Sequence, residues 1–255
     1  MVQLEKLVQF EHLRQIAGLA HGVTERDTSL PLDFSLAYHT GEEPEAIQSN
    51  RSALEAWFGK QACFVSALQV HGDHVHVVEG HESRGWTAVD HGLQADALVT
   101  NVERVVLTIL TADCVPILLY DPSRRAIGAI HAGWKGTQLE IVRKTIDKMS
   151  ALYGSDPKDI LAGIGPSIGG CCYEVGGEVA EHFVAYPDAI VSEANGAYLL
   201  DLKVVNASQL EMAGLQRTHI EISSVCTACE HRRFFSYRAE EGTAGRFMSC
   251  IMLGG

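Results

Sequence analysis

Apolar residues occur along this chain mainly in short runs that are typical of strands. Residues 105–110 read VVLTIL, residues 115–120 read VPILLY and residues 126–131 read AIGAIH. Runs of this length, bounded by turn residues and rich in Val, Ile and Leu, indicate strands of a sheet. Residues 74–78 alternate between polar and apolar positions, which is also a strand pattern. Composition predicts further strands at 62–70, 95–100, 159–165, 198–202 and 219–223, and a last one at the C-terminus.

The segments between these runs include several with the pattern of helices. A helix is predicted from Pro44, a residue that suits a first helical turn, to Phe58, and Gly59 ends it. A second amphipathic helix is predicted over 136–152. Its inward-facing residues are expected to be Ile141, Val142, Ile146, Met149 and Leu152. Further helices are predicted at 178–186 and at 203–213, the latter ended by Gly214.

No linker and no repeat divides the sequence. Residues 1–20 do not decide between helix and strand. The following turn-rich stretch, residues 21–45, indicates a long loop with a short extended part near residues 34–38. The alternation of strand and helix patterns predicts one α/β domain with mixed sheets over residues 1–255.

Composition and charge exclude several classes of protein. The chain carries 20 basic and 32 acidic residues, a formal net charge of -12, so attraction to nucleic acid or to anionic lipid is not expected. No apolar run approaches the roughly 20 residues of a membrane helix, and the charged N-terminus does not resemble a secretory signal peptide. The seven cysteines are odd in number, which favours a reducing compartment and a cytoplasmic protein.

Three candidate metal ligands lie at the ends of the apolar runs. Cys114 stands between two runs, His131 ends the third run, and His71 lies upstream in the sequence Gln-Val-His-Gly. Each is next to a small residue, and strand ends are where α/β proteins place their sites. A thiolate with two imidazoles suits zinc or copper, and three protein ligands leave the open position of a catalytic site. The ordinary alternative is a structural histidine and a buried, inert cysteine.

Two other cysteine motifs compete with this trio. Cys226, Cys229 and His231 form a C-x-x-C-x-H pattern, a metal or redox signal, but no second C-x-x-C completes a four-ligand site. Cys171 and Cys172 are adjacent, and neighbouring side chains on extended backbone point in opposite directions, so we do not expect both to bind one metal.

The glycine-rich segment 163–170 could offer N–H groups to an anion, or form a tight structural turn.

Several separated motifs resemble those of one known family. QVHG, DALVTN, TADCVPILLYDP, HAGWKGT, GIGPSIGGCCYEVG and SYRAEEGTAGR occur here in the order seen in the YfiH (laccase-domain) family, and they span residues 69–246. Members of that family have been described as polyphenol oxidases or laccases and as purine nucleoside phosphorylases. The family binds zinc through the His of QVHG, the Cys of ADC and the His of HAGW. The resemblance therefore implies that His71, Cys114 and His131 are both metal ligands and catalytic residues.

The resemblance also implies a fold and an activity. The fold would be α/β, like the catalytic domain of cytotoxic necrotizing factor. The activity would be phosphorolysis of adenosine, inosine and S-methyl-5'-thioadenosine, with hydrolytic deamination of adenosine. The expected partners are therefore a small-molecule nucleoside and phosphate, and the oligomeric state stays open. Candidate phosphate-binding residues are Arg51, Lys135, Arg238 and Arg246, and Asp96 or Asp113 could orient a ligand or move a proton.

This sequence departs from the family pattern in three places. The N-terminal GG-x-S stretch is His21-Gly22-Val23-Thr24, Lys135 replaces the usual Arg of GWRG, and Ser167 replaces the usual Cys of GPCIG. These differences leave undecided which residues bind the phosphate and the base, but they do not affect the three metal ligands.

Three other functions stay open at this point. Cys114 and His131 could act as nucleophile and base of a cysteine hydrolase or amidase that edits a cell-wall precursor. A copper-dependent polyphenol oxidase would need a weak axial ligand, often Met, and several His-rich clusters, which this sequence lacks. A non-enzymatic binding protein would hold a closed, four-ligand metal.

Overall fold

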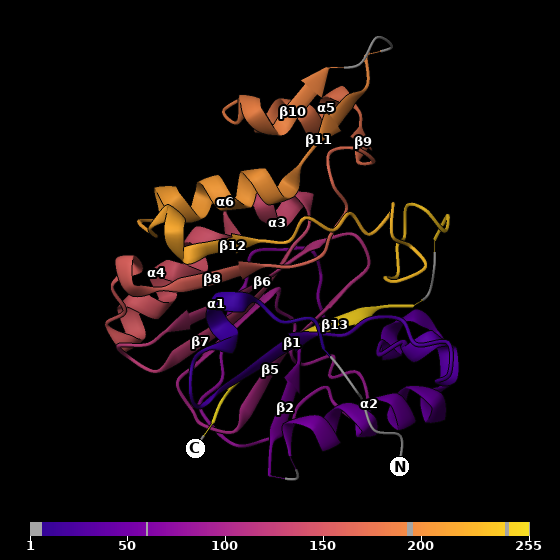
Figure 1. The fold of residues 1–255 in the computed structure, drawn as a ribbon, viewed down its shortest axis with the longest axis vertical. Helices are drawn as coiled ribbons and strands as arrows, with labels where there is room; N and C mark the ends of the chain where they lie inside the picture. Colours follow the sequence, from indigo (N-terminus) through magenta and orange to yellow (C-terminus); the bar gives the residue numbers. More distant parts are fainter. Residues whose placement is uncertain (1–6, 60, 193–195, 243–244, 255) are drawn as a thin grey trace.

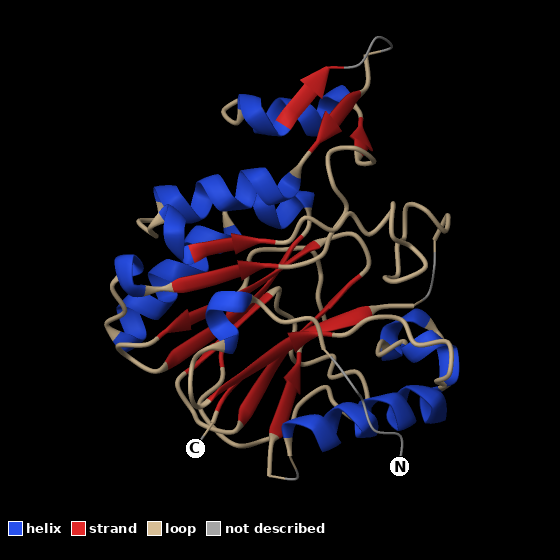
Figure 2. Cartoon of the chain, viewed as in Figure 1, coloured by secondary structure: helices blue, strands red, loops and turns tan. Residues whose placement is uncertain are grey.

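Two facing β-sheets form the centre of the protein, with helices on their outer faces (Figures 1 and 2). The computed structural model describes residues 7–59, 61–192, 196–242 and 245–254. Part of the undecided N-terminal segment, residues 1–6, therefore lies outside the described residues. Among the helices that are described, none has the length and apolar character needed to cross a bilayer. The expected mixed α/β fold is confirmed.

The larger sheet has six strands in the order β12-β8-β6-β7-β4-β3. Its antiparallel centre is built from the apolar runs of the sequence, and its two outer strand pairs are parallel. The strands are β3 (Val75–Val77), β4 (Ala97–Thr100), β6 (Val115–Asp121), β7 (Ala126–Ala132), β8 (Leu161–Ile164) and β12 (Ile220–Ile222).

The smaller sheet has four strands in the order β1-β13-β5-β2. The C-terminal strand β13 lies between the first strand and β5, so both ends of the chain contribute to one sheet. Only the pairing of β2 with β5 is parallel. The strands are β1 (Leu19–Val23), β2 (Cys63–Ser66), β5 (Val105–Thr111) and β13 (Phe247–Leu253). Residues 21–23, expected as loop, thus form a strand together with residues 19–20, which the sequence left undecided.

Alternate residues of the central strands enter different cores. In β6, Ile117 and Leu119 pack toward the helices, whereas Leu118 and Tyr120 pack between the two sheets. In β5, Leu107 enters the inter-sheet core, while its neighbours on the other face meet the helix over residues 44–58. Because both faces are buried, these strands have continuous apolar runs instead of alternation.

Helices cover both outer faces. Helix α2 (Pro44–Phe58) covers the four-stranded sheet, and Gly59, at φ 96°, follows it as predicted. Helices α4 (Ile141–Tyr153) and α6 (Leu202–Met212) pack on the six-stranded sheet (Figure 1). A short helix α1 (Glu11–Arg14) precedes β1. The order of layers is helix, sheet, sheet, helix.

The predicted helix over 136–152 is wrong as one element. It is divided into α3 (Trp134–Gln138) and α4, because Glu140 adopts a left-handed conformation at φ 57°. Leu152, expected to face inward, is 51% exposed. The predicted helix over 178–186 is also shorter: only α5 (Gly177–Ala180) and a 3-10 turn over Glu181–Phe183 form.

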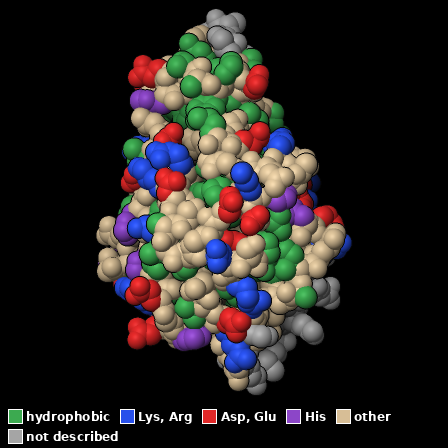
Figure 3. All heavy atoms as spheres, turned by 90° about the vertical axis from the view of Figure 1, so that its left-hand side faces the viewer, with side chains coloured by type: hydrophobic (Ala, Val, Ile, Leu, Met, Phe, Trp, Pro, Cys, Tyr) green, Lys and Arg blue, Asp and Glu red, His purple; other side chains and the backbone are tan. Residues whose placement is uncertain are grey.

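A small extension projects from the helical layer, at the top of Figure 1. It contains a three-stranded sheet of β9 (Glu174–Val175), β10 (Ile190–Ser192) and β11 (Tyr198–Leu200), together with α5. Hydrophobic side chains gather at this end of the molecule in Figure 3, and Val184 and Val191 of the extension are exposed. On the rest of the face in Figure 3, acidic and basic side chains are interspersed.

Candidate metal and substrate site

Cys114 lies in the tight connection through which the chain passes from one sheet to the other. Strand β5 belongs to the four-stranded sheet and β6 to the six-stranded sheet, with only residues 112–114 between them. Asp113 adopts φ 89° in this connection. Its carboxylate accepts hydrogen bonds from Thr227 Oγ1 at 2.7 Å and from the backbone N–H of Arg238 at 2.6 Å. The strained turn that presents Cys114 is therefore held by residues far along the chain.

His131 reaches the same place from β7. Antiparallel pairing places Pro116 of β6 opposite His131. Cys114 comes two residues before Pro116, so it lies close to the histidine. The buried carboxylate of Asp96 accepts a hydrogen bond from His131 Nδ1 at 2.8 Å. This contact fixes the ring and leaves Nε2 available, as outer-sphere carboxylates do for metal-ligating histidines.

Asp96 also organises the third residue. The backbone N–H groups of Val70, His71 and Gly72 all donate to its carboxylate, at 3.2, 2.9 and 2.7 Å. His71 adopts φ 59°, an uncommon conformation that these three bonds support. One buried side chain thus positions both imidazoles.

The structure brings the predicted trio together. The ligand atoms of His71, Cys114 and His131 all lie within 4.8 Å of one another, and the two imidazole rings are 4.7 Å apart at 83°. At Gly133, a Cβ atom would lie 3.1 Å from Cys114 Sγ and 3.2 Å from the His71 ring. A glycine at this position therefore leaves room for the three side chains to converge. The set of donors, its close spacing and the support from Asp96 fit a zinc ion.

Without a metal ion, the trio is strongly polarised. Burial opposes ionisation of the Cys114 thiol, but the charge and hydrogen bond of His131 dominate and lower its pKa to about 6. Burial likewise opposes protonation of His131, but the Cys114 thiolate and Asp96 raise its pKa to about 9. The pair is thus a thiolate with an imidazolium near neutral pH, and a thiolate is the form that binds metal.

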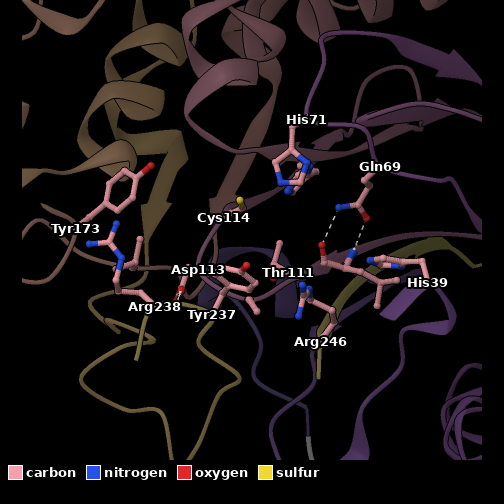
Figure 4. Close-up of a pocket in the computed structure, with 14 residues that line it drawn as sticks. His39, Gln69, His71, Thr111, Asp113, Cys114, Tyr173, Tyr237, Arg238 and Arg246 are labelled. Atoms are coloured by element: carbon pink, nitrogen blue, oxygen red, sulfur yellow. Dashed lines mark hydrogen bonds between the residues drawn. The ribbon is translucent and has the colours of Figure 1, made fainter. Parts of the chain in front are cut away.

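A pocket of about 400 Å³ opens beside the trio (Figure 4). This volume is within the range of small-molecule sites. Tyr173 and Arg238 lie on one side of it, and His39 and Arg246 lie on the other. Gln69 fixes the rim by exchanging two hydrogen bonds with the backbone of Leu110, at 2.7 and 2.8 Å. The pocket therefore combines aromatic faces, two cations and the trio.

Of the four expected phosphate-binding residues, two line the pocket. Arg238 packs against the ring of Tyr173 at 5.3 Å and donates to the Glu174 carbonyl at 3.0 Å. Arg246 packs against Tyr237 at 5.8 Å, and burial lowers its pKa. Both guanidinium groups are therefore held near the pocket by neighbouring aromatic rings.

The other two lie elsewhere. Arg51 is 1% exposed and donates to the carbonyls of Leu36, Gly85 and Trp86. Burial lowers its pKa to about 10. Lys135 is exposed on α3, beside the ring of Trp134. Neither is among the residues that line the pocket.

Some lining residues were not singled out from the sequence. Tyr173 and Tyr237 are part of the motifs CCYEVG and SYRAEEGTAGR, so the resemblance contained a signal for them. His39 comes from a loop far upstream, with no local pattern to mark it. Only the tertiary structure reveals it.

The glycine-rich segment 163–170 contains the end of β8 and the structural loop that follows it. Four of its N–H groups are already donated inside the protein, to Pro116 O, Asp113 O, Cys226 Sγ and Asp201 Oδ2. They are therefore not free to cradle an anion.

The expectation that Cys171 and Cys172 do not both bind one metal assumed extended backbone, and that assumption is wrong. Residues 169–173 form a turn and not extended backbone, and the N–H groups of Cys172 and Tyr173 both donate to the Gly169 carbonyl. The turn brings both thiols to Cys226 and Cys229, and all four sulfur atoms lie within 4.8 Å of one another. His231 is not part of this group.

The fold and the site define a class: a mixed α/β protein in which a Cys-His₂ set lines a pocket where two sheets meet. Residues 20–254 match the family model described as multi-copper polyphenol oxidoreductase laccase. The chain belongs to this family, which includes proteins named YfiH and YlmD.

Similar proteins carry a second description. The chain is 32% identical to a purine nucleoside phosphorylase of Bacteroides thetaiotaomicron, over 98% of this chain and 97% of that protein. It is 36% identical to the purine nucleoside phosphorylase YlmD of Bacillus subtilis, over 84% and 79% of the two chains. The crystal structure of YlmD from Geobacillus stearothermophilus superposes with a TM-score of 0.89 at 31% identity, over 100% of this chain and 98% of that one. YfiH of Bacillus licheniformis superposes at 0.86 with 35% identity and covers 92% of each chain.

Proposed function

We propose that this protein is a zinc-dependent purine nucleoside phosphorylase that acts on adenosine, inosine and S-methyl-5'-thioadenosine, and that it also deaminates adenosine. The observation that carries the proposal is the convergence of His71, Cys114 and His131 on a pocket that holds two arginines. The names of the relatives, which describe purine nucleoside phosphorylases, support the substrate class.

We assign the metal to His71, Cys114 and His131. A bound zinc ion would supply a Lewis acid and a water of lowered pKa in the open fourth position. Asp96 keeps Nδ1 of His131 as the donor and holds the His71 loop in place. The protein thus fixes the ligand geometry before substrate arrives.

Phosphorolysis requires phosphate placed against C1' of the ribose. A phosphate oxygen forms the new bond to C1' as the bond from C1' to the base breaks, and the electron pair leaves with the base. Arg238 and Arg246 supply positive charge on opposite sides of the pocket, which suits a dianionic nucleophile. We therefore assign phosphate binding to these two arginines, and not to Arg51 or Lys135.

The departing base needs hydrogen-bond donors and an apolar surface. Burial lowers the pKa of His39, and Arg246 lowers it further, so this histidine is neutral near pH 7 and can still donate one hydrogen bond. Burial raises the pKa of Tyr173 to about 12, which keeps its phenol protonated. We assign recognition of the purine to these side chains and to the ring of Tyr237.

The test is a direct assay. Metal-replete protein is incubated with adenosine or inosine and phosphate, and free base and ribose phosphate are separated by chromatography. Arg246→Gln should lower kcat/KM for phosphate roughly tenfold or more, because one charged hydrogen bond is lost. Arg143→Gln, on the exposed face of α4, is the matched control. Absence of adenine, hypoxanthine and inosine from the wild-type reaction would reject the proposal.

A cysteine hydrolase is the second candidate, because Cys114, His131 and Asp96 form a nucleophile, base and orienting carboxylate in series. Such a triad needs one imidazole, whereas here His71 approaches the same thiol. The second imidazole favours a metal site. A chelator separates the two candidates: it should abolish phosphorolysis, whereas an amidase that works through the Cys114 thiolate would keep its activity.

A copper phenol oxidase is not favoured by the donors. In the described part of the chain, no methionine lines the pocket to serve as a weak axial ligand. The other group of side chains there that could hold a metal ion is made of cysteines alone and not of histidines.

A further inference from the structure

Four cysteines from two distant loops gather beside the pocket. Cys171 and Cys172 lie in the turn between β8 and β9, and Cys226 and Cys229 follow β12. All four sulfur atoms lie within 4.8 Å of one another. We call them the four-cysteine cluster.

The two loops are fastened so that the sulfur atoms converge. The backbone N–H of Thr227 donates to the Ser167 carbonyl at 3.0 Å, which aligns the loops in parallel. Sγ of Cys172 lies 3.4 Å from Sγ of Cys229, and Sγ of Cys171 lies 3.7 Å from it. The N–H of Gly169 points at Cys226 Sγ from 3.2 Å. A backbone donor aimed at sulfur favours a thiolate there.

We propose that the four-cysteine cluster is a second metal site, a closed tetrathiolate site for zinc. Four sulfurs at about 2.3 Å from a tetrahedral zinc lie roughly 3.8 Å from one another. The observed separations of 3.4 and 3.7 Å are close to that value. Four protein ligands leave no open position, so the site is structural and not catalytic.

The alternative for such a cluster is a disulfide. A disulfide joins one pair at about 2.05 Å and leaves the other two sulfurs unrelated to it. In this cluster, Cys229 is close to two thiols at once and Cys226 completes the group. Convergence of all four atoms is the requirement of a metal ion and not of a single bond. Cys171 and Cys229 are exposed, so an ion can reach the cluster.

A metal in the cluster would stabilise one wall of the pocket. Ile168 and Tyr173, which line the pocket, flank the cysteine turn. Thr227, next to Cys226, donates to the Asp113 carboxylate that holds the Cys114 turn. The second site would therefore affect substrate binding only indirectly, by holding these pocket residues in place.

The first experiment counts metal ions in protein purified under reducing conditions. We expect about two zinc ions per chain in the wild type, about one in a His71→Ala/Cys114→Ala variant and about one in a Cys226→Ser/Cys229→Ser variant. Cys63→Ser, which changes a free cysteine of β2, is the matched control and should keep both ions. X-ray absorption of zinc in the His71→Ala/Cys114→Ala variant should show about four sulfur ligands at about 2.3 Å.

Two outcomes would overturn the proposal. One is a single zinc ion in the wild type that disappears in the His71→Ala/Cys114→Ala variant. The other is a Cys171–Cys229 or Cys172–Cys229 disulfide in the freshly purified protein, detected by mass spectrometry. The zinc count and the disulfide are both read on the wild type, and only the comparison with the His71→Ala/Cys114→Ala variant requires that variant to fold. Neither readout depends on nucleoside turnover.

Discussion

At the scale of single residues, Asp96 has the largest share in organising the site. Its carboxylate accepts hydrogen bonds from three consecutive N–H groups at 70–72 and from His131 Nδ1. Burial alone would raise the pKa of Asp96, but the hydrogen bond and charge of His131, together with the backbone N–H groups of Gly72 and Val70, lower it overall. The side chain is therefore a carboxylate anion, which can only accept hydrogen bonds, and its surroundings provide four donors.

Asp96→Asn tests this role. The amide has one acceptor oxygen and presents N–H groups to donors, so two or more of the four bonds are lost while the volume stays the same. We expect zinc affinity to fall about 10- to 100-fold, as for other carboxylates behind metal-ligating histidines. Competition with a coloured chelator measures this, and circular dichroism monitors the fold. Unchanged zinc affinity would show that Asp96 does not position the ligands.

Arg51 shows how a sequence pattern can place a residue in the right element without deciding which groups it contacts. It lies in the predicted helix, but its face turns into the protein, where burial and three carbonyls satisfy it. The sequence marks Arg51 as a candidate phosphate-binding residue. Whether its guanidinium binds a ligand or backbone carbonyls depends on the segments at Leu36 and at 85–86, which fold over it.

At the scale of elements, α2 is attached to the rest of the protein through Arg51. The guanidinium joins the helix to the loop at Leu36, which leads to His39, and to the segment at Gly85 and Trp86. It also packs between the rings of Tyr38 and Trp86, at 4.6 and 4.7 Å. The helix thus supports one side of the pocket from behind.

Arg51→Leu should therefore destabilise the protein. It leaves three carbonyls without their donor, those of Leu36 and Trp86 in buried bonds and that of Gly85 in a partly buried one, and we expect a loss on the order of 3 kcal/mol in the free energy of unfolding. At temperatures where the variant stays folded, KM for phosphate should stay near the wild-type value, because Arg51 does not line the pocket. Urea denaturation and initial rates measure the two effects, and Arg143→Leu, exposed on α4, is the control. A stable variant with a strongly raised KM would assign phosphate binding to Arg51 after all.

The junction of α1 with β1 predicts a pH dependence. His21 of β1 is fully buried, accepts a hydrogen bond from the Phe10 N–H through Nε2 at 2.9 Å, and stacks on the Phe10 ring. Burial lowers its pKa from 6.5 to about 4. The unfolded state therefore binds the proton first, so stability is complete above pH 6.5 and is lost as the pH falls toward 4.

The loss attributable to His21 should be roughly 3 kcal/mol between these limits. It is measured as the difference in pH dependence of unfolding between the wild type and His21→Asn, with the exposed His91→Asn as control. Parallel stability curves for wild type and His21→Asn between pH 7 and pH 4 would contradict the assignment.

Most elements were predictable because burial on both faces gives strands an unmistakable apolar run, as in β5, β6 and β7. The division of the helix predicted over 136–152 was not predictable. The helical spacing of its apolar residues runs without a break across residues 138–140, and only tertiary contacts divide it there. Asn206 donates to Thr137 Oγ1 at 3.0 Å and Gln209 to the Thr137 carbonyl at 2.9 Å. A Cβ at Gly136 would lie 3.0 Å from the Gly72 carbonyl. These partners lie about 70 residues away, and the local pattern contains no trace of them.

At the scale of the whole molecule, the site lies at two of the connections that carry the chain between the two facing sheets. The His71 loop connects β2 of the smaller sheet with β3 of the larger one, and the Cys114 turn connects β5 with β6 in the same way. The trio was predictable from strand ends and from motif resemblance. The order of the strands was not, because β13 inserts between β1 and β5 from the far end of the chain.

A metal held by residues 71, 114 and 131 would therefore join two of the crossings between the facing sheets, and its removal should affect the stability of the whole protein. Binding to the folded state alone contributes about 4 kcal/mol when free zinc exceeds Kd a thousandfold. For a chain of this size that corresponds to a change in Tm on the order of 10 °C. Calorimetry with and without chelator measures the shift in the wild type.

The same shift in His71→Ala isolates the contribution of the trio, because any metal in the four-cysteine cluster is removed from both proteins alike. We expect the chelator to lower the Tm of the wild type by clearly more than that of His71→Ala. Equal shifts would mean that zinc at the trio does not connect the two sheets. The metal would then act on the pocket alone, and the packing between β5, β6 and β7 would be sufficient to hold the sheets together.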